Sequence, residues 1–420
     1  MTTMHAPRQV RGRPAAARPS PARRTAPAAP RQVAFWLIAL VLGVTMLGTT
    51  LPTPLYVIYQ GRWHFSAATV TVTFAVYAAA VLTTLLLAGR SSDQAGRRPV
   101  MAVALAASAL STVLFILAPG IGVLIVARVV SGLSAGLMTG TATAALTELI
   151  PASASRRASL VATAANMGGL GLGPLIAGLF AQYAPHPTTL VFEVYLAVLA
   201  AAALLLLLVP ETVRPRTRPA LRFAGLGVPE LGRGEFIAAA VAAFAAFALL
   251  GLFGSLVPGF IGGVLHQGSH AVQGGIVFAL FAVGTVTQVM LSRFSSRRVV
   301  LAGLALLLAA LGLIVAALAM AGMALFLAGT AAGGVAVGAI FGGSLATASR
   351  LAPAGRRGQV ISAFFLACYA GLIIPVVGVG VLAGFTGTFP AVLAFSILLA
   401  MLCLFSIARI GRIASPGEPA

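Results

Sequence analysis

Three charged residues stand out because of where they lie along the chain. Asp93 is the only aspartate and falls in a polar loop, whereas Arg128 and Glu193 lie inside apolar runs. An ionised side chain within a membrane-length apolar segment costs at least a few kcal/mol unless it faces a cavity, a partner or the membrane surface. Arg128 and Glu193 are therefore candidates for coupling ion movement to a conformational change. For Glu193, three hypotheses stay open: pairing with Arg128, a proton-linked role, and an acid that reaches the membrane surface.

Uncharged polar side chains are scattered through the same apolar runs. Each could face a pathway through the protein or make a hydrogen bond between packed helices. A pathway lined in this way would be mostly apolar with a few donors and acceptors, which suits an amphipathic or weakly polar ligand. The candidates are Tyr56, Tyr77, Asn166, Gln273, Gln288 and Tyr369.

The remaining reactive residues exclude several classes of protein. The chain has seven acidic residues and five histidines, and all 27 basic residues are arginine. Without lysine there is neither a Walker lysine for nucleotide hydrolysis nor a Schiff-base lysine. The scattered acids do not form the cluster that a metal site or a membrane-embedded lipid-linked transferase needs. We therefore expect no enzyme activity, no catalytic residue, no cofactor and no metal, and we interpret Cys368 and Cys403 as buried thiols.

The elements that must position these residues are membrane-spanning helices. Of the 420 residues, 60% are hydrophobic and 8% are charged, with a mean hydropathy of +1.04. A soluble domain carries roughly 25% charged residues, and a bilayer core takes about 20 helical residues to cross. The sequence predicts an all-α integral membrane fold with twelve transmembrane helices, at residues 34–59, 65–88, 99–118, 121–146, 158–183, 188–209, 235–259, 270–291, 299–319, 323–349, 358–384 and 389–409.

The arginines predict the orientation of these spans. Seven precede the first span, and nearly all the others lie in every second gap between spans. Because short cytoplasmic loops retain arginine, both termini are predicted to be cytoplasmic. The Arg-only, Ala- and Gly-rich residue usage suggests a GC-rich bacterial genome and hence an inner (plasma) membrane. The net charge of +20 then reflects topology, and we expect no nucleic-acid partner. The predicted parts are a disordered tail 1–33, a six-helix bundle 34–209, a linker 210–234, a six-helix bundle 235–409 and a tail 410–420.

An internal repeat supports the division into two bundles. Adding 202 to the positions of Gly132, Gly136 and Gly140 gives Gly334, Gly338 and Gly342, and adding 200 maps Arg97-Arg98 onto Arg297-Arg298. Matches in order at a nearly constant offset indicate a duplicated six-helix unit, so the bundles should be pseudo-symmetric. Glycines spaced by four let neighbouring helices approach closely. Pro174 and its mate Pro375 are candidate pivots.

Several segments resemble motifs of the major facilitator superfamily. The loop Gly89-Arg90-Ser91-Ser92-Asp93-Gln94-Ala95-Gly96-Arg97-Arg98 resembles its signature loop, although Ser91 and Gln94 depart from the usual residues. Arg128, followed by Gly132 and Gly136, resembles the fourth-helix motif. The fifth span resembles a motif of the 12-helix drug:proton antiporter subgroup, through Gly169, Gly173, Pro174 and Gly178, and the sixth span ends on Pro210-Glu211-Thr212, as is frequent there.

The resemblance implies a latch on the cytoplasmic side. When the cytoplasmic side is closed, Asp93 would dock at the N-terminus of the eleventh span, near Gly358, with Arg97 or Arg98 and Glu148 completing the cluster. Glu148 maps onto Arg350, which suggests either a bridge between them or two separate solvated charges. The latch residues are then Gly89, Asp93, Gly96, Arg97, Arg98, Glu148 and Arg350.

The resemblance also implies a function. We expect a monomeric secondary transporter in the lipid bilayer, working by alternating access, with a small-molecule substrate and protons as partners. Proton-coupled efflux of amphipathic drugs or small metabolites is the leading hypothesis, and uptake of a sugar or organic acid is the alternative. The first span contains no carboxylate. Asp93, Glu193 or water linked to Arg128 would therefore have to carry the proton.

Overall fold

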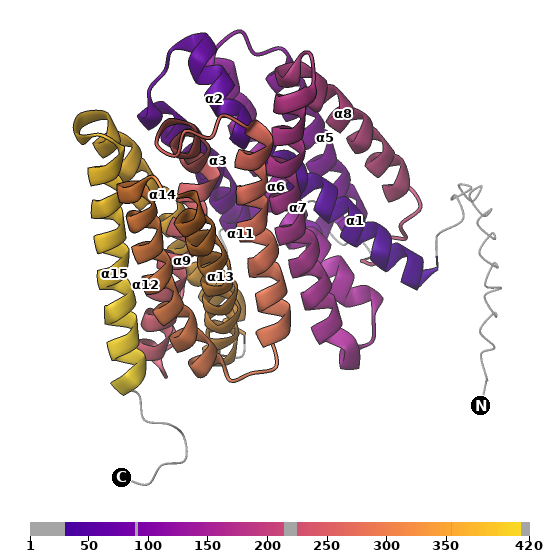
Figure 1. The fold of residues 1–420 in the computed structure, drawn as a ribbon. Helices are drawn as coiled ribbons and strands as arrows, with labels where there is room; N and C mark the ends of the chain where they lie inside the picture. Colours follow the sequence, from indigo (N-terminus) through magenta and orange to yellow (C-terminus); the bar gives the residue numbers. More distant parts are fainter. Residues whose placement is uncertain (1–29, 89–90, 214–224, 354, 413–420) are drawn as a thin grey trace, which may run out of the picture.

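A computed structural model describes residues 30–88, 91–213, 225–353 and 355–412 (Figure 1). These residues form helices and loops, with no strand among them. Within the described residues, twelve helical spans are long and apolar enough to cross a membrane, and their ends lie within a few residues of the predicted ones. The all-α fold with twelve spans is therefore confirmed. Gly89 and parts of the predicted tails and linker (1–29, 214–224 and 413–420) lie outside the described residues.

The helices follow one another with short connections. In chain order they are α1 (Arg31–Thr50), α2 (Pro52–Trp63), α3 (Ala67–Ala88), α4 (Ser91–Ala95), α5 (Arg97–Ile116), α6 (Ile121–Leu149), the 3-10 turn η1 (Ala152–Ala154), α7 (Ser155–Tyr183), α8 (Pro187–Leu206), α9 (Arg233–Ser255), α10 (Val257–Gly263), α11 (His270–Leu291), α12 (Ser296–Met320), α13 (Met323–Leu351), α14 (Arg357–Thr386) and α15 (Thr388–Arg412).

Two spans are interrupted at corresponding places. α1 gives way to α2 just before Pro52, and α9 gives way to α10 beside Pro258. Proline has no N–H to donate and its ring crowds the preceding turn, so a break is expected there. Pro174 and Pro375, in contrast, lie inside the continuous helices α7 and α14. Their role as pivots stays a prediction.

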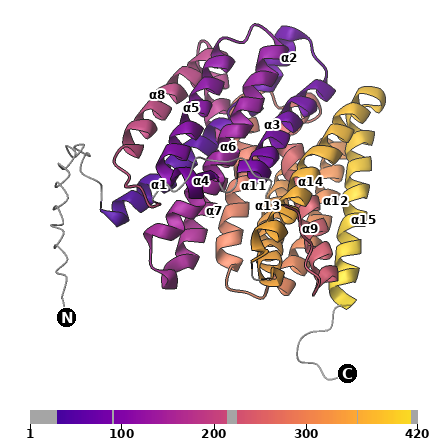
Figure 2. The same ribbon diagram turned by 180° about the vertical axis from the view of Figure 1, so that it is seen from behind.

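The helices form two groups, α1–α8 and α9–α15, which lie side by side in Figures 1 and 2. Within the first group α6 packs against α3 and α5, and within the second α13 packs against α12. The groups meet mainly along two helix pairs, α7 with α11 and α3 with α14. Because twelve spans are an even number, α1 begins and α15 ends at the same end of the assembly, which we call the terminal end; the opposite end is the distal end.

Glycines provide the close helix approaches that their spacing predicts, with one exception. A Cβ on Gly338 would overlap the backbone of Gly284, and a Cβ on Gly136 would lie 2.6 Å from the Cβ of Thr84. Comparable approaches occur at Gly132, Gly169, Gly173, Gly178 and Gly334. Nothing lies within 4 Å of a Cβ placed on Gly140, so the predicted packing role of that glycine is wrong.

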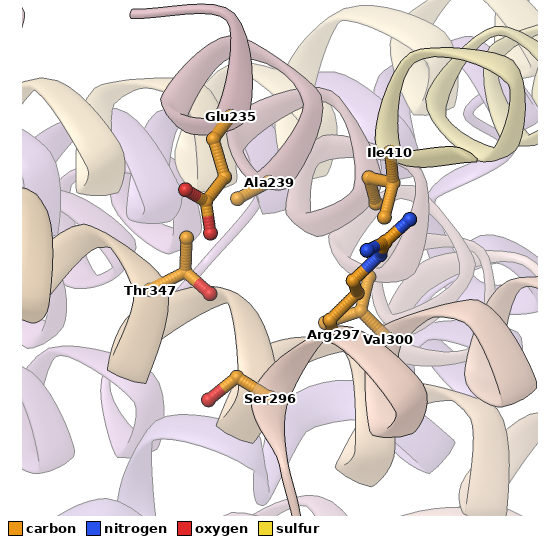
Figure 3. A pocket seen from close by; sticks show the side chains of 7 residues that line it. All are labelled: Glu235, Ala239, Ser296, Arg297, Val300, Thr347 and Ile410. Carbon is orange, nitrogen blue, oxygen red and sulfur yellow. The ribbon is translucent and has the colours of Figure 1, made fainter. Parts of the chain in front are cut away.

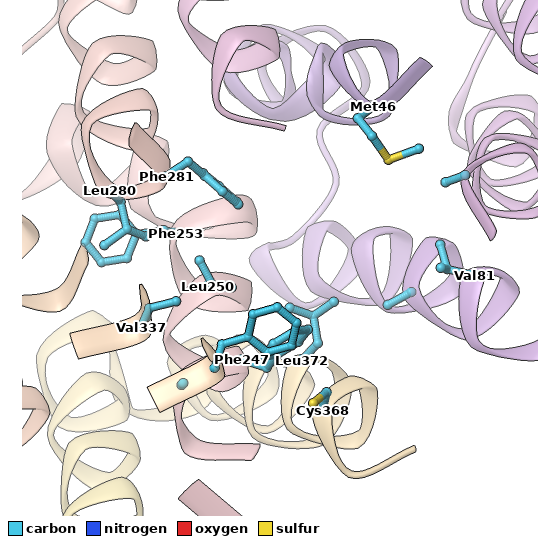
Figure 4. Packing of buried hydrophobic residues seen from close by; sticks show 14 of the residues in the cluster. Met46, Val81, Phe247, Leu250, Phe253, Leu280, Phe281, Val337, Cys368 and Leu372 are labelled. Atoms are coloured by element: carbon cyan, nitrogen blue, oxygen red, sulfur yellow. The ribbon is translucent and has the colours of Figure 1, made fainter. Parts of the chain in front are cut away.

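One apolar core extends through both groups (Figure 4). It joins α1 and α3 of the first group to α9, α11, α13 and α14 of the second. The two groups therefore meet through apolar side chains, which can separate and repack without breaking buried ion pairs. Labelled members in Figure 4 are Met46, Val81, Phe247, Leu250, Phe253, Leu280, Phe281, Val337, Cys368 and Leu372.

Candidate functional site

A charge cluster surrounds Arg97 at the start of α5, at the terminal end. Arg97 is buried, with 7% of its surface exposed. Its Nη2 lies 2.6 Å from Asp93 Oδ1 and 2.7 Å from Glu148 Oε1. Its Nη1 donates a hydrogen bond to Ser92 Oγ. One guanidinium thus ties the short helix α4 and the end of α6 to the start of α5.

A third carboxylate, from the chain that follows α8, completes the same cluster. Glu211 accepts the backbone N–H of Arg97 at 2.8 Å and that of Arg98 at 3.0 Å. Thr212 Oγ1 donates to Glu148 Oε2 at 2.6 Å. An anion is favoured at a helix N-terminus, where free N–H groups point outward. Sequence reasoning treated Pro210-Glu211-Thr212 only as a span ending and missed this role.

Glycine is required where Glu211 approaches α5. Gly96 has a φ of +98°, which side chains of L-residues rarely adopt, and a Cβ there would lie 2.6 Å from Glu211 Oε2. The glycine of the signature loop therefore has a physical reason in this chain: it leaves room for the carboxylate that binds the α5 N-terminus.

The predicted latch is assembled only in part. Asp93, Arg97 and Glu148 come together as expected, but within the first group of helices. Asp93 pairs with Arg97 and does not dock at α14. Arg350 pairs with Glu235 of α9 and not with Glu148. The contacts of Asp93 with α14 and of Glu148 with Arg350, which are expected when the cytoplasmic side is closed, are not formed in this conformation and stay predictions.

Arg128 occupies an aromatic enclosure at the break between α1 and α2. It is fully buried. Nε donates to the Tyr56 hydroxyl at 2.6 Å, and Nη1 donates to the carbonyl oxygen of Thr49 at 2.5 Å. The guanidinium carbon lies 5.2, 5.5 and 5.8 Å from the ring centres of Tyr56, Tyr77 and Phe115. Nη2 has no hydrogen-bond partner among the described residues.

This arrangement explains how a buried cation is held without a carboxylate. Thr49 belongs to the last turn of α1, whose carbonyl groups form the negative end of the helix dipole. Three aromatic faces add cation–π attraction, which strengthens when the cation is desolvated. Arg128 therefore contacts both helices that meet at the α1–α2 break.

Glu193 lies elsewhere. It is exposed on α8, whereas its neighbour Phe192 is buried and stacks on Phe115. Direct pairing of Glu193 with the fully buried Arg128 is therefore wrong. An exposed acid near the start of α8 fits the hypothesis of a side chain reaching the membrane surface. A proton-linked role for Glu193 stays a prediction.

The predicted pathway residues separate into different environments. Tyr56 and Tyr77 contact Arg128. Asn166 donates to Thr139 Oγ1 at 3.2 Å. Gln288 lines a narrow space between α7, α9, α11 and α13 that is otherwise mainly apolar.

Gln273 and Tyr369, the remaining two candidates, lie in very different surroundings. The Gln273 side chain is buried at the distal end and donates to the carbonyl oxygen of Gln267 at 3.1 Å, so it stabilises a loop and its predicted pathway role is wrong. Tyr369 is half-buried, with its ring centre 6.1 Å from that of Phe247. Phe247 also contacts Phe341, at 5.3 Å. This aromatic group between α9, α13 and α14 was missed by sequence reasoning, which considered only polar side chains.

The two groups of helices close tightly at the distal end. A Cβ on Gly274 of α11 would overlap the carbonyl oxygen of Pro174 in α7. The backbone N–H of His270 donates to Gln182 Oε1 at 3.0 Å across the same pair. On the α3–α14 side, a Cβ on Gly380 would overlap Thr71.

Comparison with known proteins gives one family. The model of the Major Facilitator Superfamily matches residues 38–376. The "Uncharacterized MFS-type transporter YceJ" of Bacillus subtilis (strain 168) is 29% identical over 185 residues, which cover 44% of this chain and 46% of that protein. The chain thus aligns with about half the length of this curated relative.

Solved structures share the fold. The crystal structure of the human organic anion transporter MFSD10 (TETRAN) has a TM-score of 0.66 at 19% identity, covering 91% of this chain and 100% of that chain. A bacterial homologue of the human lysosomal transporter Spinster, inward-facing and occupied, has a TM-score of 0.70 at 15% identity, covering 91% and 96%. Its unoccupied inward-facing form has a TM-score of 0.66 at 16% identity, covering 91% and 94%. At these identities the likeness shows the fold.

Proposed function

Because the chain belongs to the Major Facilitator Superfamily, a family of transporters and not of enzymes, we propose that it is a secondary transporter working by alternating access. In this family the two halves rock about a site near the middle of the membrane. The halves here are residues 34–209 and 235–409. We place the protein in the bacterial inner membrane as a monomer, with the terminal end facing the cytoplasm.

One observation carries this proposal: the contacts between the halves differ in kind at the two ends. At the distal end backbone meets backbone, through Gly274 and Pro174. At the terminal end the ion pairs of Arg97 and Arg350 lie within one half each, and Arg156 of α7 donates an exposed hydrogen bond to Ser292 Oγ of the other half at 3.1 Å. Backbone contact at the distal end, against an exposed side-chain hydrogen bond at the terminal end, favours an inward-facing conformation.

The lining between the halves supports an amphipathic substrate. Apolar and aromatic side chains such as Phe247, Phe341 and Tyr369 are interrupted by few donors, among them Asn166 and Gln288. We therefore favour proton-coupled efflux of amphipathic drugs or small metabolites, as in the drug:proton antiporters. Uptake of a sugar or organic acid is the alternative.

Inverted membrane vesicles test both candidates. With an acidic lumen, a proton-coupled exporter should accumulate a lipophilic cationic dye and release protons as it does so. Vesicles without the protein serve as the control. Accumulation of a hexose or a monocarboxylate without dye movement would support the uptake alternative. Movement of no probe under an imposed pH gradient would contradict transport of these substrate classes.

A single substitution of a glycine between α7 and α11 tests whether the halves close at the distal end. Gly274→Val places atoms where the Pro174 carbonyl lies, so we expect the distal end to stay open and transport to fall at least tenfold, about 1.4 kcal/mol. Spin labels at Tyr183→Cys and Val272→Cys, both exposed, should move apart. Gly275→Val is the matched control, because nothing lies within 4 Å of its Cβ position. Identical label distances in both variants would contradict the closure.

A further inference from the structure

A cation and an aromatic ring lie together on the surface of the first half, near the terminal end. The guanidinium carbon of Arg157, in the first turn of α7, lies 5.9 Å from the ring centre of Trp36, in the second turn of α1. Both side chains are exposed. The pair belongs neither to the Arg97 cluster nor to the Arg128 enclosure, so the transport cycle proposed above leaves it without a role.

Trp36 lies on a side of α1 that faces the lipid. Trp36 and Leu40, one turn apart, are 49% and 51% exposed, whereas Phe35 and Ile38 are buried. Figures 1 and 2 both place the start of α1 at the edge of the first group, away from the second group. Large apolar side chains exposed there contact acyl chains. Trp36 is about 8 Å along α1 from Arg31, which is close to the membrane–water interface, where tryptophan is enriched.

The charge of Arg157 is not balanced by an acid on either helix. α1 and α7 contain three arginines, Arg31, Arg156 and Arg157, and neither helix contains an aspartate or a glutamate. Arg157 takes part in none of the ion pairs of the described residues. Its attraction to the indole involves the face of the ring and leaves guanidinium N–H groups able to donate. An arginine at this depth attracts anionic headgroups.

The preceding arginine has a different partner. Arg156 Nη2 donates to Ser292 Oγ of the second half at 3.1 Å. Successive residues of an α-helix point about 100° apart, so one arginine faces the other half while the next faces α1. The two positions therefore carry the same charge but present it to different surroundings.

The second half shows that this arrangement is not a general feature of a first span. α9 opens the second half as α1 opens the first. Phe236, in the first turn of α9, is only 4% exposed. Its neighbour Glu235 lines a pocket between α9, α12, α13 and α15 (Figure 3). The start of α9 thus turns its aromatic residue inward and carries a carboxylate, unlike the start of α1.

We propose that Arg157 and Trp36 form a binding site for the headgroup of an anionic phospholipid, such as phosphatidylglycerol. The Arg157 guanidinium donates to the phosphate, and the acyl chains lie along the exposed side of α1 that includes Leu40. A zwitterionic headgroup carries a phosphate too, but its own ammonium group offsets the charge, so the site prefers a lipid with net negative charge. Because α7 also packs against α11 of the second half, the lipid binds a helix that takes part in the contacts between the halves.

The fluorescence of Trp36 measures which lipid occupies the site. The chain has two tryptophans, Trp36 and Trp63, so Trp63→Phe leaves a single reporter. The full chain is reconstituted in mixed bilayers of phosphatidylcholine and phosphatidylglycerol, and one of the two lipids carries brominated acyl chains, which quench tryptophan on contact. Quenching at several lipid ratios gives the relative affinity of the two lipids beside Trp36. Both leaflets have the same composition, so the result depends neither on the orientation of the protein nor on transport.

We expect phosphatidylglycerol to be preferred about fivefold over phosphatidylcholine beside Trp36. Arg157→Gln should abolish this preference, and it should not impair folding because Arg157 is exposed. Arg156→Gln is the matched control, because it removes the same charge from the adjacent residue and should leave the preference unchanged.

Three results would overturn the proposal. The first is equal affinity for the two lipids in the parent protein. The second is an equal fall in both glutamine variants, which would assign the preference to the overall charge of this membrane face. The third is the absence of quenching by either brominated lipid, which would show that Trp36 does not face the bilayer.

Discussion

Arg128→Met is expected to lower transport roughly 100-fold, equal to about 2.7 kcal/mol, while changing the free energy of unfolding by less than about 1 kcal/mol. Transport and stability are expected to respond differently because the arginine contributes to them in different ways. A buried cation without a carboxylate contributes little to stability, and an apolar side chain of similar length can fill its enclosure. Arg128, however, donates hydrogen bonds from α6 both to Thr49 in the last turn of α1 and to Tyr56 of α2.

Transport in vesicles and thermal unfolding of the same preparations measure the two quantities. Arg62→Met is the matched control. Arg62 is an exposed arginine of α2, so its replacement should change transport and thermal stability little. Tyr56→Phe removes the hydroxyl that accepts from Arg128 Nε, so its transport rate should lie between those of the wild type and Arg128→Met. Wild-type transport by Arg128→Met would show that the α1–α2 break is not part of the working cycle.

Arg97→Ala is expected to destabilise the protein by about 2–3 kcal/mol, the largest loss among the charged residues described. Breaking a buried ion pair on one side leaves the opposite charge uncompensated, which costs 3–5 kcal/mol at full burial. The Asp93 and Glu148 side chains are 53% and 32% exposed, so water reduces that cost. Asp93→Asn should cost less than about 1 kcal/mol, because its own charge is mostly solvated.

Equilibrium unfolding in detergent measures these losses. Arg98→Ala is the control, because Arg98 contributes its backbone N–H and not its side chain to Glu211. In the double variant Arg97→Ala with Glu148→Ala, the loss should be smaller than the sum of the single losses, since the uncompensated carboxylate is gone. Additive losses would show that Arg97 and Glu148 do not interact in the folded protein.

Sequence reasoning located the charged residues that matter but not their partners. The motif loop, Arg128 and the repeat were all visible as patterns along the chain. Glu211 was visible too, yet nothing local distinguishes a carboxylate that ends a span from one that binds another helix. Glu193 and Arg128 lie at similar predicted depth, but they point to opposite sides of their helices: one outward, one into the core.

The sequence by itself determined the twelve spans, their order and their grouping by sixes, because the thickness of a bilayer fixes how many consecutive apolar residues a helix needs. Only the tertiary structure decided that Arg97 joins Asp93 to Glu148, that Arg350 turns to Glu235, and that Arg128 rests on aromatic rings. Each residue rotates the side-chain direction by about 100° around a helix, so a pairing between helices depends on how those helices pack and rotate against each other. Residue spacing within one segment carries no information on that rotation.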